Sequence, residues 1–264
     1  MKGHLMRIQI IPLFSGSTGN CILVQAGGTN LLVDAGITAK ALTGALAQTG
    51  LRMDDIAAVL ITHEHADHIK GLPVLVKKYG TPVYATEGTW RMMHGKFREI
   101  PKFRPVFVPD GTFYIGDLAV DSFPLSHDAA QPVGYAFFHM GEKASIATDT
   151  GYVSKGMIRA LEGSATILLE SNHDPVMLQT GPYPGVLKRR VASRKGHLSN
   201  EDCARVVAHL AQNGTHQVIL GHLSMKNNTP ELAYDSTCRA LQELGIDPEN
   251  GFSLSVAPPV LFTD

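Results

Sequence analysis

Residues 62–68 concentrate side chains that can bind metal, in the stretch Thr62-His63-Glu64-His65-Ala66-Asp67-His68. Three imidazoles and a carboxylate packed so closely cannot all find partners in a protein core, whereas zinc, manganese and iron accept nitrogen and carboxylate ligands. In an extended backbone His63 and His65 point the same way because side chains alternate, and Asp67 and His68 can then turn toward a second ion. The stretch therefore predicts a metal site, in preference to a polar helix start with incidental histidines.

Three further metal donors stand just past short apolar runs elsewhere in the chain, namely His127, Asp149 and His222. Each would be an ordinary turn residue if it stood by itself. Together with residues 62–68 they give more candidate ligands than one tetrahedral ion takes, so the pattern predicts two metal sites. The candidate ligands are His63, His65, Asp67, His68, His127, Asp149 and His222.

The elements that must position these residues alternate between short apolar runs and stretches of helical period. We expect strands at 5–14, 21–26, 30–34, 57–62, 83–85, 105–108, 112–125, 132–139, 143–148, 164–170 and 216–220. We expect helices at 38–49, 69–79, 154–161, 200–212 and 230–244. Because each strand-rich half is followed by helices, we predict two packed sheets with helices outside, in a single α+β domain over residues 1–264. Residues 86–104 and 171–196 are basic and are expected to be irregular.

The composition fits a globular protein, because 44% of the 264 residues are hydrophobic and 18% are charged. No apolar run approaches the roughly 18 residues of a membrane span, so we expect no membrane association. The 23 basic and 24 acidic residues nearly cancel, so a polyanion site must come from local clustering. Cys21, Cys203 and Cys238 lie far apart, which argues against a disulfide framework and favours a cytoplasmic location.

The order of the metal-binding residues along the chain resembles the metallo-β-lactamase superfamily. Its pattern is an early strand-end aspartate, here Asp34, then the H-x-H-x-D-H motif at 63–68, then His127, Asp149 and His222. The resemblance covers essentially the whole chain. It implies an αββα sandwich of two mixed sheets flanked by helices, with a dinuclear metal site at one edge of the sheets.

The same resemblance implies a role for each of these residues. One ion is held by His63, His65 and His127. The other ion is held by Asp67, His68 and His222, and Asp149 bridges the two. Asp34 is implied to orient ligands rather than to bind metal; the alternative is a plain strand-end aspartate before Gly36.

Glu170 and His197 are similar to the glutamate and histidine of tRNA 3′-processing enzymes (RNase Z). In those enzymes the histidine protonates the leaving oxygen of a phosphodiester and the glutamate orients the histidine, which lowers the barrier by general acid catalysis. Simple thioesterases and lactamases have less need of such an acid. The alternative is that Ser199 or Asn200 caps helix 200–212 and that His197 merely precedes it.

Several stretches outside the metal ligands resemble the YycJ (WalJ) branch of the superfamily. They are residues 15–21, 170–174, 181–184, 196–200 and 227–231. Members of that branch are associated with 5′-to-3′ exonuclease activity on DNA. Thr18 departs slightly from the branch, where serine is common at this position. The protruding arm with which RNase Z grips tRNA is not evident, which argues against tRNA processing.

A basic run lies between Glu170 and His197, and it contains Lys188, Arg189, Arg190, Arg194 and Lys195. A solvated helix face is the plain alternative, but the adjacent phosphodiester chemistry favours contact with phosphates. We expect Lys188, Arg189, Arg190 and Asn200 to contact substrate. Tyr183 offers a ring for stacking on a terminal base, and ordinary loop packing of a proline-flanked tyrosine is the alternative. The roles of His173 and of the basic stretch 91–104 stay open.

We therefore expect a phosphodiesterase with two divalent metal ions (zinc, manganese or iron), acting as a 5′-to-3′ exonuclease on DNA. Its expected catalytic residues are Asp67, Glu170 and His197. Two alternatives stay open: a small-molecule phosphodiester or thioester hydrolase of the same fold, and a non-catalytic metal-binding regulator. A structural zinc site needs only four ligands, which argues against the regulator.

Overall fold

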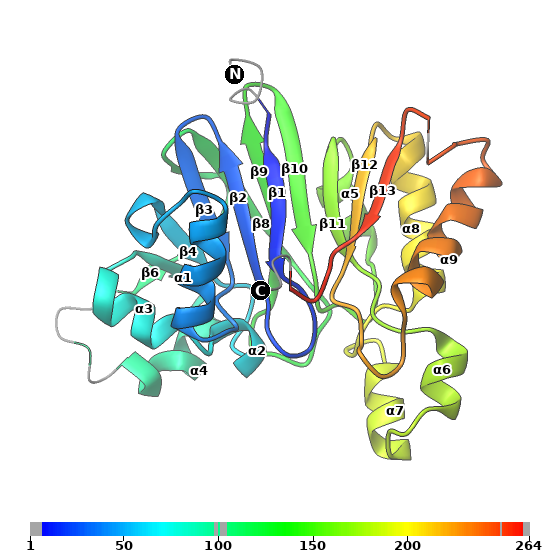
Figure 1. The fold of residues 1–264 in the computed structure, drawn as a ribbon, viewed down its shortest axis with the longest axis horizontal. Helices are drawn as coiled ribbons and strands as arrows, with labels where there is room; N and C mark the ends of the chain where they lie inside the picture. The colour runs from blue at the N-terminus through cyan, green and yellow to red at the C-terminus, as the bar shows by residue number, and fades with distance from the viewer. Residues whose placement is uncertain (1–6, 98–99, 101–104, 249, 261–264) are drawn as a thin grey trace.

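Two β-sheets lie against each other between two groups of helices in the computed structural model of the chain (Figure 1). The structure describes residues 7–97, 100, 105–248 and 250–260. The described helices of the first group are α1 (Ala39–Gln48), α2 (Ala66–Ile69), α3 (Leu72–Tyr79) and α4 (Glu87–Phe97). Those of the second are α5 (Lys155–Leu161), α6 (Pro175–Thr180), α7 (Gly185–Val191), α8 (Asn200–Gln212) and α9 (Pro230–Gln242). The expected αββα sandwich is confirmed.

The first sheet joins an antiparallel meander to parallel strands. Its described strands, in spatial order, are β1 (Gln9–Phe14), β2 (Cys21–Ala26), β3 (Thr29–Val33), β4 (Ala58–Leu60), β5 (Val83–Ala85) and β6 (Val106–Phe107). The pairs from β1 to β3 are antiparallel, and the pairs from β3 to β6 are parallel. The carboxyl ends of β3 and β4 therefore meet at one edge of the sheet.

The second sheet is mixed in the same way. Its described strands, in spatial order, are β13 (Ser253–Val256), β12 (Gln217–Gly221), β11 (Thr166–Glu170), β10 (Glu142–Ala147), β9 (Val133–His139), β8 (Leu118–Pro124) and β7 (Phe113–Ile115). The strands β10 to β13 run parallel, so β10, β11 and β12 also end at a common edge.

Alternating side chains of β2 divide the core into layers. Ile22 and Val24 belong to the core between the two sheets, where they join Tyr135 and Phe137 of β9. Leu23 faces the opposite way and packs in the cluster under α1, α3 and α4. This alternation follows from the two-residue period of a strand. A third cluster lies between the second sheet and the helices α5, α8 and α9.

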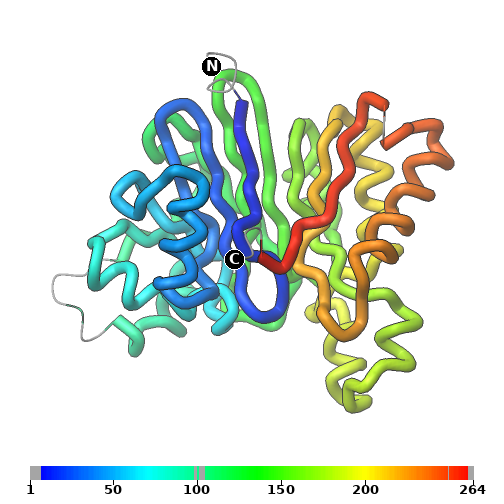
Figure 2. Tube along the Cα trace, in the orientation of Figure 1, coloured from blue at the N-terminus to red at the C-terminus, as the bar shows by residue number. Residues whose placement is uncertain are grey.

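The first and last described segments lie side by side at the centre of the molecule (Figures 1 and 2). Phe14 at the end of β1 forms a bridge with Val260, and the Ser15 N–H donates to the carbonyl of Pro259 at 3.3 Å. This contact joins the first strand of one sheet to the segment that follows the last strand of the other. None of the described helices has both the length and the apolar character that a membrane span requires.

The expected elements are mostly present, but several differ from the expectation. Residues 87–97 form α4, where an irregular stretch was expected, because Trp90, Met93 and Phe97 present an apolar face to the core. The expected strand 112–125 is two strands, β7 and β8, which turn at Gly116 with φ of 56°. The expected helix 69–79 is broken before Leu72, and β13 was not anticipated.

Two segments of the sequence interpretation extend beyond the described residues. The expected strand 5–14 begins outside them, and its described part is β1, from Gln9. In the basic stretch 91–104, Arg98, Lys102 and Arg104 lie outside the described residues. Arg91 forms an exposed ion pair with Glu87 on α4 at 3.2 Å.

Candidate metal centre

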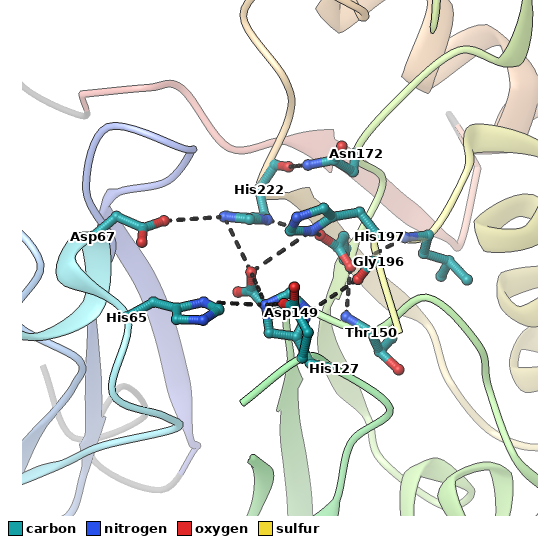
Figure 3. Close-up of polar contacts among 12 residues, drawn as sticks. His65, Asp67, His127, Asp149, Thr150, Asn172, Gly196, His197 and His222 are labelled. Atoms are coloured by element: carbon teal, nitrogen blue, oxygen red, sulfur yellow. Dashed lines mark hydrogen bonds and ion pairs between the residues drawn. The ribbon is translucent and has the colours of Figure 1, made fainter. Parts of the chain in front are cut away.

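The loop between β4 and α2 carries the first group of candidate ligands. His65 has an extended backbone and is the residue before α2. Its Nδ1 lies 3.0 Å from Nε2 of His63 and 3.3 Å from Nε2 of His127, which follows β8. Three nitrogens therefore converge on one point, as an ion with nitrogen ligands requires. Figure 3 shows His65 and His127 of this group.

The second group of candidate ligands lies beside the first. The carboxylate of Asp67 is 3.5 Å from Nε2 of His68 and 3.9 Å from Nε2 of His222. Asp149 reaches both groups, because its Oδ2 lies 3.2 Å from Nε2 of His68 and its Oδ1 lies 3.7 Å from Nε2 of His127. The structure thus brings together all seven residues that the sequence nominated.

Two buried atoms at the centre of this cluster suit a cation. Among the described residues, Oδ2 of Asp149 and Nε2 of His222 make no hydrogen bond although both are buried. Such atoms are costly to bury unless a ligand satisfies them. Both point into the space shared by the candidate ligands, so the residues present fit divalent metal ions.

Three site residues have left-handed backbones. Asp34 follows β3 with φ of 64°, Asp149 lies two residues after β10 with φ of 59°, and His222 follows β12 with φ of 56°. Side chains other than glycine seldom adopt this region, although aspartate and histidine tolerate it better than most. Each turn aims its side chain along the strand end toward the cluster, at a cost of about 1–2 kcal/mol.

Asp34 is fully buried and holds two histidines in orientation, as the resemblance implied. Nδ1 of His68 donates to its Oδ2 at 2.7 Å. Thr62 donates its backbone N–H and its hydroxyl to the same carboxylate, each at 2.9 Å. The Thr62 hydroxyl oxygen in turn lies 3.0 Å from Nδ1 of His63. Because the Nδ1 atoms carry these hydrogen bonds, the Nε2 atoms of both histidines are left to bind metal.

Glu170, at the end of β11, is shared between the candidate acid and a candidate ligand. Its Oε1 accepts from Nδ1 of His197 at 2.8 Å and from Nδ1 of His222 at 2.7 Å. Its Oε2 accepts the backbone N–H groups of Thr150 at 2.8 Å and Leu198 at 3.2 Å. Burial opposes ionisation of this carboxylate, but the histidine partners prevail and lower its pKa to about 2. The sequence indicated the contact with His197 and gave no sign of the one with His222.

His197 lies beside the ligands with part of its side chain open to solvent (Figure 3). Its ring centroid is 5.1 Å from that of His127 and 5.4 Å from that of His222, and its side chain is 19% exposed. Burial disfavours the imidazolium, but the negative charge of Glu170 prevails and raises the pKa of His197 above its usual value. Nδ1 is occupied by Glu170, so Nε2 is the nitrogen that can serve a substrate.

The candidate ligands differ in the charge that they carry before metal binds. Burial and neighbouring histidines lower the pKa of His63, and burial also lowers the pKa of His127. In the second group, burial is outweighed by carboxylates, which raise the pKa of His222 to about 10 and that of His68 above its usual range. His63 and His127 are therefore ready to bind an ion at neutral pH, whereas His68 and His222 must release protons.

A pocket of about 210 Å³ opens over these residues, and one of its walls comes from the segment α6–α7. Tyr183, Leu187, Arg190 and Val191 line it on that side. The basic run was expected to lie near the site, and the structure places it on α7 and the loop that follows, beyond the body of the sandwich (Figure 1). The two short helices were not anticipated, because the sequence there has several prolines and no sustained period.

The residues expected to contact substrate fall into different positions. Arg190 lines the pocket, while Arg189 is exposed and Lys188 donates its Nζ to the carbonyl of Gln179 at 2.6 Å. Asn200 is a correction to the sequence interpretation. It is 1% exposed, and its side chain bonds to Ser171 and Asn228, so it is not presented to a substrate.

His173, whose role the sequence left open, stays apart from the candidate ligands. It is buried, it bridges to Ser199 through the backbone, and burial lowers the pKa of its imidazole. It belongs to none of the potential ligand groups found among the described residues. Its backbone helps to hold the end of β11 against the start of α8.

A comparison with known families decides the lineage of the chain. The beta-lactamase superfamily domain matches residues 29–223. This chain belongs to the beta-lactamase superfamily. That membership agrees with the fold and with the order of ligands along the sequence. Within the superfamily, the chain is 42% identical to the Bacillus anthracis protein named exodeoxyribonuclease YycJ, over 98% of each chain.

Two other relatives agree with this placement in the superfamily. The Streptococcus pneumoniae D39 protein named exodeoxyribonuclease WalJ is 41% identical, over 89% of this chain and 90% of the relative. Among solved structures, the metallo-beta-lactamase fold protein YhfI from Bacillus subtilis has a TM-score of 0.70 at 18% identity, and the match covers 96% of this chain and 97% of YhfI. At that identity, the likeness to YhfI concerns the fold.

Proposed function

We propose that this protein is a divalent-metal-dependent phosphodiesterase that degrades DNA as a 5′-to-3′ exonuclease. The observation that carries the proposal is the position of His197, which Glu170 holds beside the candidate metal ligands with its Nε2 free. A hydrolase that needs no general acid has little use for this pair. The relatives named exodeoxyribonuclease support DNA as the substrate.

Two divalent ions, zinc, manganese or iron, are assigned to this site. One ion would be held by His63, His65 and His127. The other ion would be held by Asp67, His68 and His222, and Asp149 would contact both ions. When bound, the ions would supply an activated water and neutralise charge on the phosphoryl oxygens. Asp34 and Glu170 keep the histidine rings in place through their Nδ1 atoms.

His197 completes the proposed reaction by providing a proton. As water attacks phosphorus, the bond from phosphorus to the 3′-oxygen of the terminal nucleotide breaks, and that oxygen leaves with the electron pair. Nε2 of the imidazolium protonates it, and the proton on Nδ1 stays in the hydrogen bond to Glu170. Glu170 raises the pKa of His197 and so favours the charged form of the acid.

Contacts with the strand are assigned to the segment α6–α7. Arg190 is on the pocket wall, and Arg189 and Lys188 belong to the same helix. Tyr183 lines the pocket and offers a ring to a terminal base. Because the net charge of the chain is −1, attraction to DNA must come from such local groups.

The test is digestion of end-labelled single and double strands that carry either a 5′-hydroxyl or a 5′-phosphate, with zinc, manganese or iron supplied after chelation. Successive loss of nucleotides from the 5′ end, abolished by chelation, is the expected result. Turnover of bis(p-nitrophenyl) phosphate with no degradation of any strand would replace this proposal with a small-molecule diesterase, which the small pocket volume would accommodate. Absence of turnover on every substrate, with metal bound, would leave the non-catalytic regulator.

We also propose that residues 1–264 form a single domain and that the protein acts in the cytoplasm. The core between the sheets draws residues from both halves of the chain, from Ile10 to Ile219. Cys21 and Cys203 are buried free thiols, which fits a reducing compartment. Limited proteolysis tests the first point, because one domain should resist cleavage between residues 150 and 200.

A further inference from the structure

Arg190 of α7, which lines the pocket, forms an ion pair with Asp128, the residue after the candidate ligand His127. Nε of Arg190 lies 2.6 Å from Oδ2 of Asp128. Neither the comparison with known families nor the reaction above gives Asp128 a role. The pair is partly exposed, because 52% of the arginine side chain and 33% of the aspartate side chain remain accessible.

Both partners belong to segments that hydrogen bonds of neighbouring residues hold to the site. The carbonyl of Val191, next to Arg190, accepts the N–H of His197 at 2.9 Å. On the other side, the loop that carries Asp128 is held by Ala130, whose N–H donates to Oε1 of Glu64 at 2.8 Å. The ion pair therefore forms between anchored segments.

The Asp128 carboxylate lies beside a candidate metal ligand. Its Oδ1 lies 3.3 Å from Nε2 of His127, the atom assigned to a metal. A phosphodiester bound at the metals would bring negative charge close to Asp128 and to the guanidinium that Asp128 holds. Arginine binds carboxylates and phosphates through the same planar donors, so one anion can replace the other.

We propose that Asp128 holds Arg190 when the pocket is free of DNA, and that a backbone phosphate of the strand takes the place of the Asp128 carboxylate on binding. This inference rests on the proposed function and adds to it the residue that limits affinity. Asp128 competes with the substrate for Arg190, and it also repels the incoming phosphate. This exchange of the carboxylate for a phosphate keeps the Arg190 side chain ordered both without DNA and with DNA bound.

The experiment compares Asp128→Asn with the unaltered, metal-loaded protein. Binding is measured with a short fluorescent single strand whose phosphorothioate linkages keep the charge and resist hydrolysis. Because the variant removes the competing charge and keeps the side-chain shape, we expect DNA affinity to rise by about two- to tenfold. The matched control is Asp54→Asn, which breaks an exposed Arg–Asp pair of 2.9 Å with Arg52 and should leave affinity as it is. Asp54 precedes the amino end of β4, whereas the metal loop follows the carboxyl end of that strand.

A double-mutant cycle with Arg190→Ala decides whether Asp128 acts through Arg190. The gain from Asp128→Asn should disappear when Arg190 is absent. A gain that persists there would mean general repulsion by Asp128 and would overturn the exchange. A loss of affinity in Asp128→Asn would mean that the carboxylate positions Arg190 for DNA, and a loss of bound metal would make Asp128 a ligand; either result also overturns it.

Failure of this inference is distinguishable from failure of the proposed function. If the unaltered protein degrades DNA but Asp128→Asn binds DNA no more tightly, the exchange alone is wrong. If the unaltered protein neither binds nor degrades DNA, the proposed function is wrong and the exchange falls with it. Circular dichroism of each variant shows whether it is folded.

Discussion

Glu170 and His222 are joined by a hydrogen bond of 2.7 Å from Nδ1 of the histidine to Oε1 of the carboxylate. The same oxygen accepts the Nδ1–H of His197 at 2.8 Å. One buried oxygen therefore orients both a candidate metal ligand and the candidate acid. A change at Glu170 should consequently alter the acid and the metal site together.

Glu170→Gln is expected to move the alkaline side of the pH–rate profile to lower pH. The acid works while His197 is protonated, so the rate is full below the pKa of His197 and falls above it. Glu170 raises that pKa, and the neutral amide removes the negative charge responsible. The measurement is kcat against pH. The control is Glu162→Gln, which alters an exposed Glu–His pair of 2.8 Å with His209 and should leave the profile unchanged. An unaltered alkaline limb in Glu170→Gln would contradict the assignment of His197 as the acid.

Asp149→Ala and His197→Ala should separate ligand from acid. Asp149→Ala removes a carboxylate that reaches both ligand groups, so metal content and activity should fall together. His197→Ala should keep the metal and lose about 10²–10⁴-fold in rate, the usual contribution of general acid catalysis. Metal analysis beside kcat gives the answer. If His197→Ala loses metal, His197 is itself a ligand, and if it keeps the full rate, it is only the residue before a helix.

The left-handed backbone of Asp149 predicts a difference between two variants that both lose the ligand. Asp149→Gly removes the steric strain at φ of 59°, whereas Asp149→Ala keeps it. In the metal-free state the glycine variant should be more stable than the alanine variant by about 1 kcal/mol, measured by urea unfolding. Gln212 in the last turn of α8 provides a control at an ordinary backbone position. There the alanine variant should be more stable than the glycine variant. Equal stability of the two Asp149 variants would mean that the turn relaxes without cost.

The two candidate metal sites should respond differently to pH. His68 and His222 have raised pKa values before metal binds, about 10 for His222, so the ion that they take must displace protons. Affinity at that site should rise with pH by about tenfold per unit for each proton released, up to about pH 10. His63 and His127 are neutral at pH 7 because their pKa values are lowered, so the ion at their site should show little pH dependence there. Calorimetric titration in buffers of different ionisation enthalpy counts the protons. Equal proton release by both ions would contradict the difference between the sites.

The salt dependence of DNA binding should be shallow, because local groups and not the net charge provide the attraction. With two to four phosphate contacts, log affinity on duplex should fall with log salt at a slope of about 2–4. Changing Arg189 and Arg190 to alanine should flatten that slope by about 2 and raise KM on long DNA. The loss of activity on a small chromogenic diester should be much smaller, because that substrate is too short to reach along α7. Equal losses on both substrates would mean that the arginines support the fold.

The sequence was sufficient to nominate the candidate metal ligands, because metal ions accept only a few residue types. Few arrangements other than a metal site account for three imidazoles and the Asp67 carboxylate within residues 63–68. A metal-binding side chain at the end of an apolar run is also visible in the local sequence. The short apolar runs of β2 and β9 likewise mark buried strands, and strand-rich halves followed by helices imply the layers. Helix α4 was missed because its polar and basic residues hide an apolar face that only the neighbouring strands identify.

Contacts between residues far apart in the chain were decided by the tertiary structure. His222 is 52 positions from Glu170, and Arg190 is 62 positions from Asp128, so no spacing rule indicates either pair. The burial of Asn200 is also a tertiary result, because a polar residue at a helix start is usually exposed. The sequence determined which atoms could bind metal and protonate a leaving group. The parallel pairing of β11 with β12, which sets Glu170 opposite Gly221, decided which oxygen orients His222, since such tertiary pairing sets the distances between distant segments.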